Sequence, residues 1–292
     1  MSSSSLSGGH KPGFRETVRS DNWWVGPALT ILVFLSFIVY ATWGAFQGQH
    51  YWVNSAFSAE TGEAQQRVDA GFGGYLSPFY SPVLFSKIDK PGAAPEEHAW
   101  FGDWSNLPYW PGFLEFSPAF LILIFPGAFR FTCYYYRKAY YRSFTGSPPG
   151  CAVGARPQGK YYGETRLLLF QNLHRYALYF AVGFVFILSW DAFQAFFRNG
   201  EFGIGVGSLV LTVNACLLAG YTFGCHSFRH LIGGKLNKFS CFAARHTAWQ
   251  GCSWLNQRHM AWAWASLFWV AFTDIYVRLV SMGIWTDYNT WS

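Results

Sequence analysis

The chain has 292 residues, of which 51% are hydrophobic and 21% aromatic; only 12% are charged, and the formal net charge is +6. So few charges and so many indole and phenol rings exclude an ordinary soluble domain. The composition therefore predicts an integral membrane protein.

Five apolar segments are long enough to cross a bilayer, because a spanning helix needs about 20 mostly apolar residues. They cover residues 24–43, 116–131, 176–197, 202–223 and 260–277. The second is short as an uncharged run, because Arg130 lies near its end, but it can extend outward through Phe113 and inward through Cys133. The predicted fold class is an all-α integral membrane protein with five transmembrane helices. Its predicted parts are an N-terminal tail at 1–22, a membrane-anchor domain at 23–287 with an outer loop at about 47–115, and a C-terminal tail at 288–292.

The first residues do not have the pattern of a cleaved signal. Met1–Gly9 is rich in serine and is followed by Lys11, Arg15 and Arg19, with no short apolar core and no small-residue cleavage site. We therefore expect the first apolar segment to remain as a helix.

Lysine and arginine, which resist translocation, are unevenly distributed among the loops. Residues 47–115 contain three basic residues against eight acidic ones, whereas residues 130–175 contain eight basic residues and a single Glu. Residues 229–258 contain five basic residues and no acidic one. The N-terminal tail and the two basic loops are thus predicted to be cytoplasmic, and the long acidic loop to lie outside with the C-terminus.

The outer loop is too aromatic for a bare linker. Its stretches Gly71–Phe85 and Trp100–Gly112 alternate turn formers with Trp, Tyr and Phe, which suits structure in the headgroup layer. We expect it to cap the outer face of the bundle.

The second helix is expected to continue past the membrane. The run TCYYYRKAYYRS mixes tyrosines with cations, as in a helix that emerges through the interface with snorkelling side chains. Pro148 and Pro149 then impose an extended turn. Cys151 follows in a Gly/Pro loop whose backbone amides can face an anion.

The third and fifth predicted helices each carry a carboxylate near the outer face. The third is expected to begin near His174 and end near Arg198, and the fourth to run from a glycine-rich start to Gly224. The carboxylates Asp191 and Asp274, near the outer face, are interpreted as ion-pair partners of Arg198 and Arg278 or as part of a proton route.

Thiols and imidazoles gather at the predicted cytoplasmic edge. Four of the eight histidines lie within a few residues of inner helix ends, namely His174, His226, His230 and His259. A pair of stacked haems needs axial ligands at two depths, which this distribution does not offer. His226 and His230 are spaced i, i+4, so both would share one face of a helix.

The cysteines allow several readings. Cys133 and Cys225 are candidate ligands or small buried apolar residues, and Cys216 is interpreted as packing. Cys241 and Cys252 are expected to be loop thiols without a clear partner. Disulfides are not expected, because three of the six cysteines lie beside basic segments that face a reducing compartment.

Three metal chemistries fit a mixed set of Cys and His. Zinc would use both residue types, but the close pair spacing of zinc modules is missing. A single haem b would use two histidines and leave the thiols unexplained. A Rieske-type [2Fe–2S] cluster uses two cysteines and two histidines, and so employs both types.

Five separated motifs resemble the membrane-anchor C subunit, a cytochrome b-like protein, of actinobacterial-type succinate dehydrogenase, or respiratory complex II. They are FPGAFRFTCYYYRKAYYRSF, SPPGCAV, ETRLLLFQNLHRY, CHSFRH and NQRHMAWAW…FTDIYVRL, and the resemblance runs from Trp23 to about Asp287. It implies a bacterial plasma-membrane complex with a flavoprotein subunit and an iron–sulfur subunit. It further implies a Rieske-type cluster in the anchor instead of haem, and a nearby site for menaquinone or ubiquinone.

The resemblance also implies a ligand set of two thiolates and two imidazoles. The matching positions are Cys133, Cys151 and Cys225 for sulfur, and His174, His226, His230 and His259 for nitrogen. His230 and His259 are favoured because they flank the loop that joins helices four and five. The sequence does not distinguish which two of the three cysteines are ligands.

The function implied is electron transfer from succinate, through the soluble subunits, to a membrane quinone. Arg137, Arg175 and Arg229 are expected to bind the iron–sulfur subunit or phospholipid, or else to polarise a quinone carbonyl. No nucleic-acid partner is expected. The alternatives are an anchor with haem b, a transporter or channel, which would more often show polar groups at mid-depth, and a structural anchor without a redox role.

Overall fold

The computed structural model describes residues 13–53, 74–86, 90–103, 117–157, 165–198, 200–234, 238 and 242–291. Contacts between Cα atoms divide the chain into two compact units. The first unit comprises Met1–Val39 and Arg130–Leu173, and the second comprises Tyr40–Phe129 and His174–Ser292.

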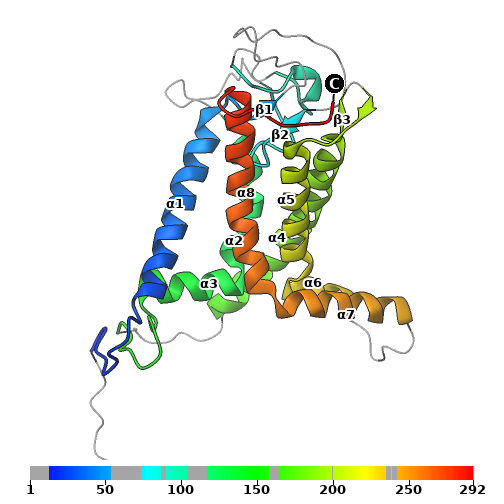
Figure 1. The fold of residues 1–292 in the computed structure, drawn as a ribbon. Helices are drawn as coiled ribbons and strands as arrows, with labels where there is room; N and C mark the ends of the chain where they lie inside the picture. Colours follow the sequence, from blue (N-terminus) through cyan, green and yellow to red (C-terminus); the bar gives the residue numbers. More distant parts are fainter. Residues whose placement is uncertain are drawn as a thin grey trace, which may run out of the picture. The chain divides into compact units, whose positions relative to one another are not determined.

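Helices account for most of the described chain (Figure 1). They are α1 (Val25–Gln47), α2 (Ala119–Thr132), α3 (Tyr134–Tyr140), α4 (Thr165–Gln194), α5 (Val206–Phe223), α6 (His226–Gly233), α7 (Ala243–Gln257) and α8 (His259–Ser281). Two single turns accompany them, a 3-10 turn η1 (Glu96–His98) and a π turn η2 (Tyr141–Thr145). Two short antiparallel pairs join β1 (Trp52–Val53) to β2 (Tyr75–Leu76) and β3 (Phe197–Arg198) to β4 (Glu201–Phe202).

Four of the described helices are long and apolar enough to cross a membrane, and a fifth span arises if the bent pair α2 and α3–η2 is one crossing. The four are Val25–Gln47, Gln171–Gln194, Val206–Phe223 and His259–Ser281. The prediction of an all-α membrane protein is thus confirmed, with four spans, or five if the bent pair is counted as one.

The break in the second span lies at Cys133. This residue is extended (φ −62°, ψ 134°), so it ends α2 and serves as the N-cap of α3. Its carbonyl accepts the Arg137 N–H at 2.9 Å, and the two helical pieces differ in direction by 76°. The chain does continue as a helix after Arg130, but the continuation is the separate helix α3, because the non-helical residue Cys133 redirects the chain.

The third helix starts earlier than expected, at Thr165 instead of near His174, and its membrane-spanning part starts at Gln171. No glycine or proline interrupts the sequence from Thr165 to His174, and leucine, a strong helix former, is frequent there. His174 consequently lies inside α4, more than two turns from its first residue.

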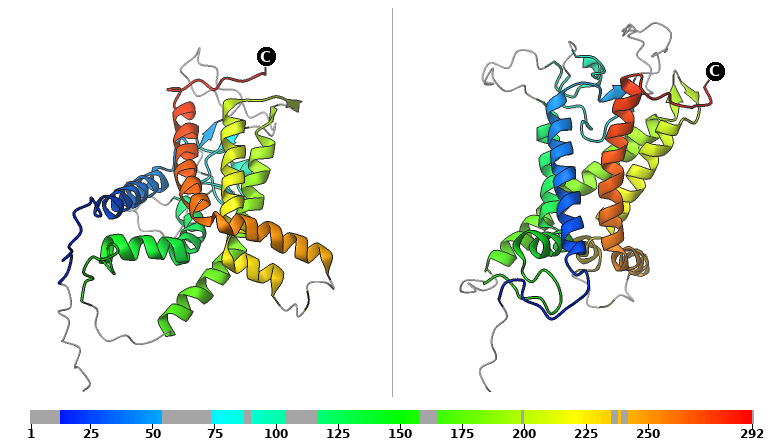
Figure 2. Two further views of the ribbon diagram at one scale, coloured as in Figure 1. Left: turned by 60° about the horizontal axis from the view of Figure 1, so that its bottom comes forward. Right: turned by 60° about the vertical axis from the view of Figure 1, so that its left-hand side comes forward.

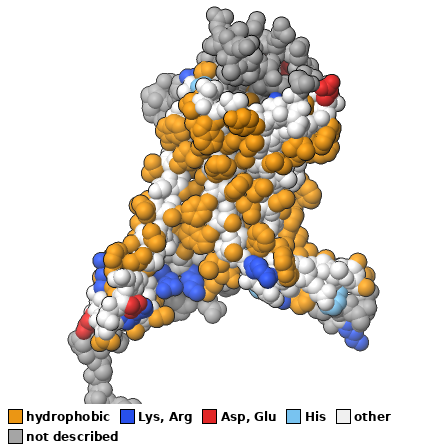
Figure 3. All heavy atoms as spheres, viewed as in Figure 1, with side chains coloured by type: hydrophobic (Ala, Val, Ile, Leu, Met, Phe, Trp, Pro, Cys, Tyr) orange, Lys and Arg blue, Asp and Glu red, His pale blue; other side chains and the backbone are white. Residues whose placement is uncertain are grey.

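In the second unit, α5 and α8 lie side by side (Figures 1 and 2). They bury small and medium side chains against each other, including Leu211, Ala215 and Val277. The Trp269 indole N–H donates to the Val210 carbonyl at 3.0 Å and so links the two helices. Figure 3 shows apolar side chains over their outward faces, as expected for surface in contact with lipid.

The described part of the outer loop packs, in the second unit, into a core that it shares with Ala45 of α1 and Ala119 of α2. Tyr51 and Tyr80 stack with ring centroids 4.1 Å apart, and Phe79 is buried with them. The cis peptide bond Ser81–Pro82 lies in this segment. Most of the predicted stretch 100–112, and residues 54–73 of the loop, lie outside the described residues.

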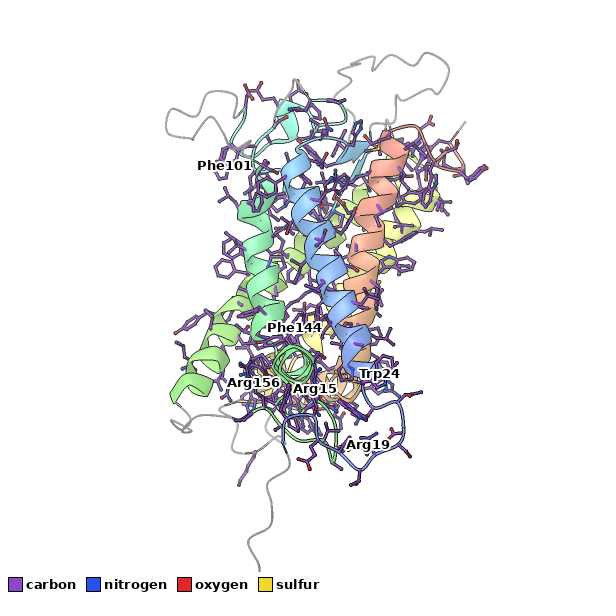
Figure 4. All side chains as sticks on the ribbon, turned by 90° about the vertical axis from the view of Figure 1, so that its left-hand side faces the viewer. Arg15, Arg19, Trp24, Phe101, Phe144 and Arg156 are labelled. Atoms are coloured by element: carbon purple, nitrogen blue, oxygen red, sulfur yellow. The ribbon has the colours of Figure 1, made fainter. Side chains whose placement is uncertain are left out.

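In the first unit, the segment before α1 is fixed by hydrogen bonds to the loop around Cys151. The Arg15 N–H donates to the Gly154 carbonyl at 2.9 Å, and the Gly154 N–H donates to the Glu16 carbonyl at 2.8 Å. Arg19 Nη1 donates to the Cys151 carbonyl at 2.9 Å. Arg15, Arg19 and Arg156 gather at one end of this unit in Figure 4. The tail predicted at 1–22 therefore contains ordered structure from residue 13.

Candidate metal centre

A histidine and a cysteine meet in the interior of the second unit. Nε2 of His174, on α4, lies 3.0 Å from Sγ of Cys225, the N-cap residue of α6. Both residues are buried, with exposed fractions of 7% and 2%. Either one donates the hydrogen, depending on the imidazole tautomer. As it stands, this is a thiol–imidazole contact with no room for an atom between the two groups.

Aromatic rings connect this pair to a second buried histidine. Phe129 of α2 stacks on the His174 ring, with centroids 4.6 Å apart and planes 6° from parallel. Its other neighbour is Tyr221 of α5, 5.3 Å away and edge-on. Tyr221 in turn stacks on His259, at 5.0 Å and 15°. The two imidazoles are thus held at fixed ring planes on either side of a phenylalanine and a tyrosine.

Local sequence explains why these groups converge. Tyr221 lies in the last turn of α5, and Cys225 follows that helix as the extended N-cap residue of α6. Gly220 allows the Trp262 ring to lie against α5, since a Cβ there would come within 2.9 Å of that ring. Asn256 Nδ2 donates to the Gly224 carbonyl at 2.8 Å and ties the end of α7 to the end of α5. His259 follows as the first residue of α8.

The other two histidines form a separate, exposed pair. His226 and His230 lie one turn apart on α6, with their Nε2 atoms 3.0 Å apart, as the i, i+4 spacing predicts. Partial desolvation of its ring lowers the pKa of His226, and the charges of His230, Arg229 and Arg175 lower it further. The four histidines therefore divide into two buried residues and two at the surface.

The remaining candidate cysteines belong to the first unit. Cys133, at the bend between α2 and α3, is buried with an exposed fraction of 2%. Cys151 is exposed, and its carbonyl accepts a hydrogen bond from Arg19. Burial thus distinguishes two thiols that the sequence left equivalent.

Two cysteines outside the candidate set are placed differently from what the sequence suggested. Cys216 was expected to be buried, but it is exposed on the surface of α5. Cys252 was expected in a loop, but it is buried within α7, and this burial raises the pKa of its thiol. Cys241 lies outside the described residues.

Within the segments that the structure describes, no three His, Cys, Asp or Glu side chains are placed to hold one metal ion together. The donor types nevertheless fit a centre with mixed ligands. Cys133, Cys225, His174 and His259 are all buried, and thiolate and imidazole are the ligands of a Rieske-type cluster.

The in-membrane carboxylates have structural partners. Asp274 and Arg278 form a buried ion pair, with Oδ2 of Asp274 2.7 Å from Nε of Arg278. This is the pairing that the first of the two interpretations expected. The hydroxyls of Tyr40 and Ser77 also donate to Asp274. Arg278 Nη2 donates to the Gly44 carbonyl at 2.9 Å.

The expected pairing of Asp191 with Arg198 is wrong. Asp191 accepts a hydrogen bond from the Ser81 hydroxyl. Arg198 lies beyond the end of α4, in β3, and its Nη2 is 3.1 Å from Oδ2 of Asp287. The hydroxyls of Tyr75 and Tyr276 each donate to Asp287 at 2.7 Å. Asp287 thus joins segments that are distant in the sequence.

Sequence reasoning did not identify Phe129 and Tyr221. Both lie within four residues of a candidate cysteine, in FRFTC and YTFGC, and this proximity is the signal that was available. In a chain with 21% aromatic residues, that signal does not distinguish them from aromatic residues in contact with lipid.

Comparisons with known proteins agree on one family. A model of the actinobacterial succinate dehydrogenase subunit SdhC family matches residues 25–283. A chain of the solved Mycobacterium smegmatis Sdh1 complex in the apo form is 42% identical, with a TM-score of 0.77. That alignment covers 97% of this chain and 96% of the other. A search of curated proteins finds no match.

Proposed function

The chain belongs to the family of actinobacterial succinate dehydrogenase subunit SdhC, and from this premise we propose that it relays electrons to a membrane quinone through an embedded Rieske-type [2Fe–2S] cluster. As a subunit of succinate dehydrogenase it is a multi-pass protein of the bacterial plasma membrane, and its partners are the flavoprotein and iron–sulfur subunits. Succinate oxidation itself belongs to the flavoprotein.

The observation that carries the proposal is the buried contact between His174 and Cys225. A thiol and an imidazole from different helices, isolated from water, are the side chains that a mixed cluster requires. Imidazole ligation would give the bound cluster a reduction potential well above that of clusters held by thiolates alone, which suits delivery of single electrons to a quinone.

Burial guides the choice among the candidate ligands. For the imidazoles we propose His174 and His259, both buried and stacked against aromatic rings, in place of the earlier preference for His230 and His259. For the thiolates we propose Cys225, which is buried beside His174. The second thiolate stays between the two candidates of the first unit, of which Cys133 is buried and Cys151 is exposed. His226 and His230 then remain as an exposed pair on α6.

The chain's own residues have defined roles in this proposal. Phe129 stacks on the His174 ring and Tyr221 stacks on the His259 ring. These contacts fix the orientation of each imidazole and so the direction in which its nitrogens point. Each histidine also has a second ring nitrogen, which can take up or release a proton as an electron passes. Such a group couples electron transfer to the proton uptake that quinone reduction requires.

Metal analysis and spectroscopy of the purified complex test the proposal. We expect iron in excess of what the soluble subunits carry, and an electron paramagnetic resonance signal of Rieske type after reduction. A sharp optical α band on reduction would instead identify haem b held by two of the histidines. Absence of any excess iron would leave a structural anchor without a redox role.

A further inference from the structure

Helices α6 and α7 form an arm that runs crosswise to α5 and α8 in the second unit (Figures 1 and 2). The arm begins where the span Val206–Phe223 ends and finishes where the span His259–Ser281 begins. Since both spans cross the bilayer, a hairpin joined crosswise to their ends lies at the level of the membrane surface.

The arm carries positive charge only. Between Glu201 and Asp274 the sequence contains no acidic residue. Its cations are Arg229, Lys235, Lys238, Arg245 and Arg258. The arm in Figure 3 accordingly shows Lys and Arg side chains among apolar ones.

Some of this charge is used to hold the arm together. Arg245 Nε donates to the Ile232 carbonyl at 3.0 Å, and its Nη2 donates to the Gly234 carbonyl at 3.1 Å, so this residue caps the end of α6. The Arg229 guanidinium lies 4.6 Å from the centre of the Trp249 ring. These contacts make the arm a packed hairpin.

Other cations of the arm face outward beside apolar side chains. Lys238 and Arg258 are exposed, and the Arg258 guanidinium lies 4.8 Å from the centre of the Trp254 ring. Trp254 is itself 53% exposed, and Leu231 and Phe242 are 49% and 56% exposed. A helix that presents Trp and Leu together with Lys and Arg, without acids, has the composition of a helix lying in the interface of an anionic membrane.

We propose that this arm is a binding surface for anionic phospholipid, in which Lys238 and Arg258 contact headgroup phosphates and Trp254, Leu231 and Phe242 enter the interfacial layer. The inference needs only that α5 and α8 cross the membrane, and it does not depend on a metal centre. Anionic lipid is favoured over a protein partner because apolar and cationic groups are interspersed along an arm that directly continues two spans.

The test uses the whole succinate dehydrogenase complex in nanodiscs that contain a photoactivatable phosphatidylglycerol or a matched phosphatidylcholine. After irradiation, mass spectrometry measures the cross-linking yield on peptides from residues 226–258. We expect a higher yield with phosphatidylglycerol, decreasing as salt is raised. In K238Q/R258Q we expect that preference to fall at least about five-fold, since each cation near an anionic surface contributes about that factor.

The matched control is R142Q/R156Q, which removes two exposed cations of the first unit and should leave the yield on the arm unchanged. An equal yield with both lipids, or an unaltered preference in K238Q/R258Q, would overturn the proposal. So would a K238Q/R258Q complex that loses the flavoprotein and iron–sulfur subunits while its lipid preference stays intact, because the arm would then be a protein-docking surface.

Discussion

Nε2 of His174 lies 3.0 Å from Sγ of Cys225, although 51 residues separate them in the sequence. The contact joins the interior of α4 to the N-cap residue of α6, and both residues are buried, with Phe129 stacked on the His174 ring. This contact identifies two candidate ligands of the proposed metal centre, and substitutions of either residue test that assignment.

Replacing Cys225 with Ser should remove the iron that the soluble subunits do not account for. A hydroxyl is a poor ligand for iron–sulfur clusters, whose irons require thiolate or imidazole. Cys216→Ser is the matched control, because Cys216 is exposed on α5 and is not a proposed ligand. Iron content and the reduced-state resonance signal are the measurements. Equal iron in wild type and Cys225→Ser would exclude Cys225 from the centre.

The buried and exposed histidine pairs should behave differently. In His174→Ala and His259→Ala we expect quinone reduction to be abolished, with succinate oxidation by a soluble acceptor retained, because only the last electron-transfer step is cut. The double variant His226→Ala/His230→Ala should keep both activities, since these rings are on the surface of α6. Loss of quinone reduction in the exposed-pair variant alone would reverse our assignment of ligands.

Asp274→Asn should destabilise the protein strongly. The substitution leaves the guanidinium of Arg278, which is only 3% exposed, without its counter-charge. Breaking one partner of a buried ion pair costs about 3–5 kcal/mol. Thermal unfolding of the detergent-solubilised complex measures the effect. Asp21→Asn breaks the exposed pair with Arg19 and should leave the unfolding midpoint unchanged; similar losses in both variants would contradict this reasoning.

Gly220→Ala should destabilise the contact between α5 and α8. A Cβ at this position would come 2.9 Å from the Trp262 ring, and overpacking of this kind costs about 1–3 kcal/mol. Gly183→Ala, on α4, is the matched control because nothing lies within 4 Å of its Cβ position. Alanine is the better helix former, so that variant should be neutral or slightly more stable. Unfolding midpoints that fall equally would show that Trp262 moves aside freely.

The outer loop should lose stability on acidification. Burial lowers the pKa of His50 from its usual 6.5, and the charge of Arg278 lowers it further. Burial also lowers the pKa of His98. The unfolded chain then binds protons more readily than the folded one, so stability is full above about pH 6.5 and decreases as the pH falls below it. Between about pH 7.5 and about pH 5.5, the unfolding midpoint of His50→Gln/His98→Gln should decrease less than that of the wild type. An identical decrease would assign the effect to other groups.

Apolar length was sufficient to predict the spans, because crossing hydrocarbon imposes a minimum run of apolar residues whatever the packing. The sequence did not reveal the bend at Cys133, since neither proline nor glycine marks it. Nor did it predict α7, because residues 229–258 were assigned to a cytoplasmic loop. That helix is stabilised by packing on α6, where Trp249 lies against Gly233, and such a contact has no local signature.

At the candidate site, the sequence predicted which residue types gather but not which of them meet. Helix ends placed His174 and Cys225 at one depth, as expected from counting apolar residues. Whether side chains at the same depth face each other depends on helix rotation, which packing sets. The same limit explains the mistaken pairing of Asp191 with Arg198, whose true partner Asp287 lies 89 residues further along the chain.

Asp287 binds Tyr75, Arg198, Gly207 and Tyr276, all of which are synthesised before it. During translation, therefore, α5 and the β3–β4 hairpin have no Asp287 carboxylate to bind until the whole last span, His259–Ser281, has been synthesised. Until then Arg198 and the two tyrosines are exposed to the insertion machinery without the carboxylate. The hydrogen bonds and the ion pair of Asp287 thus form late in biogenesis, after the helices of this unit have been synthesised.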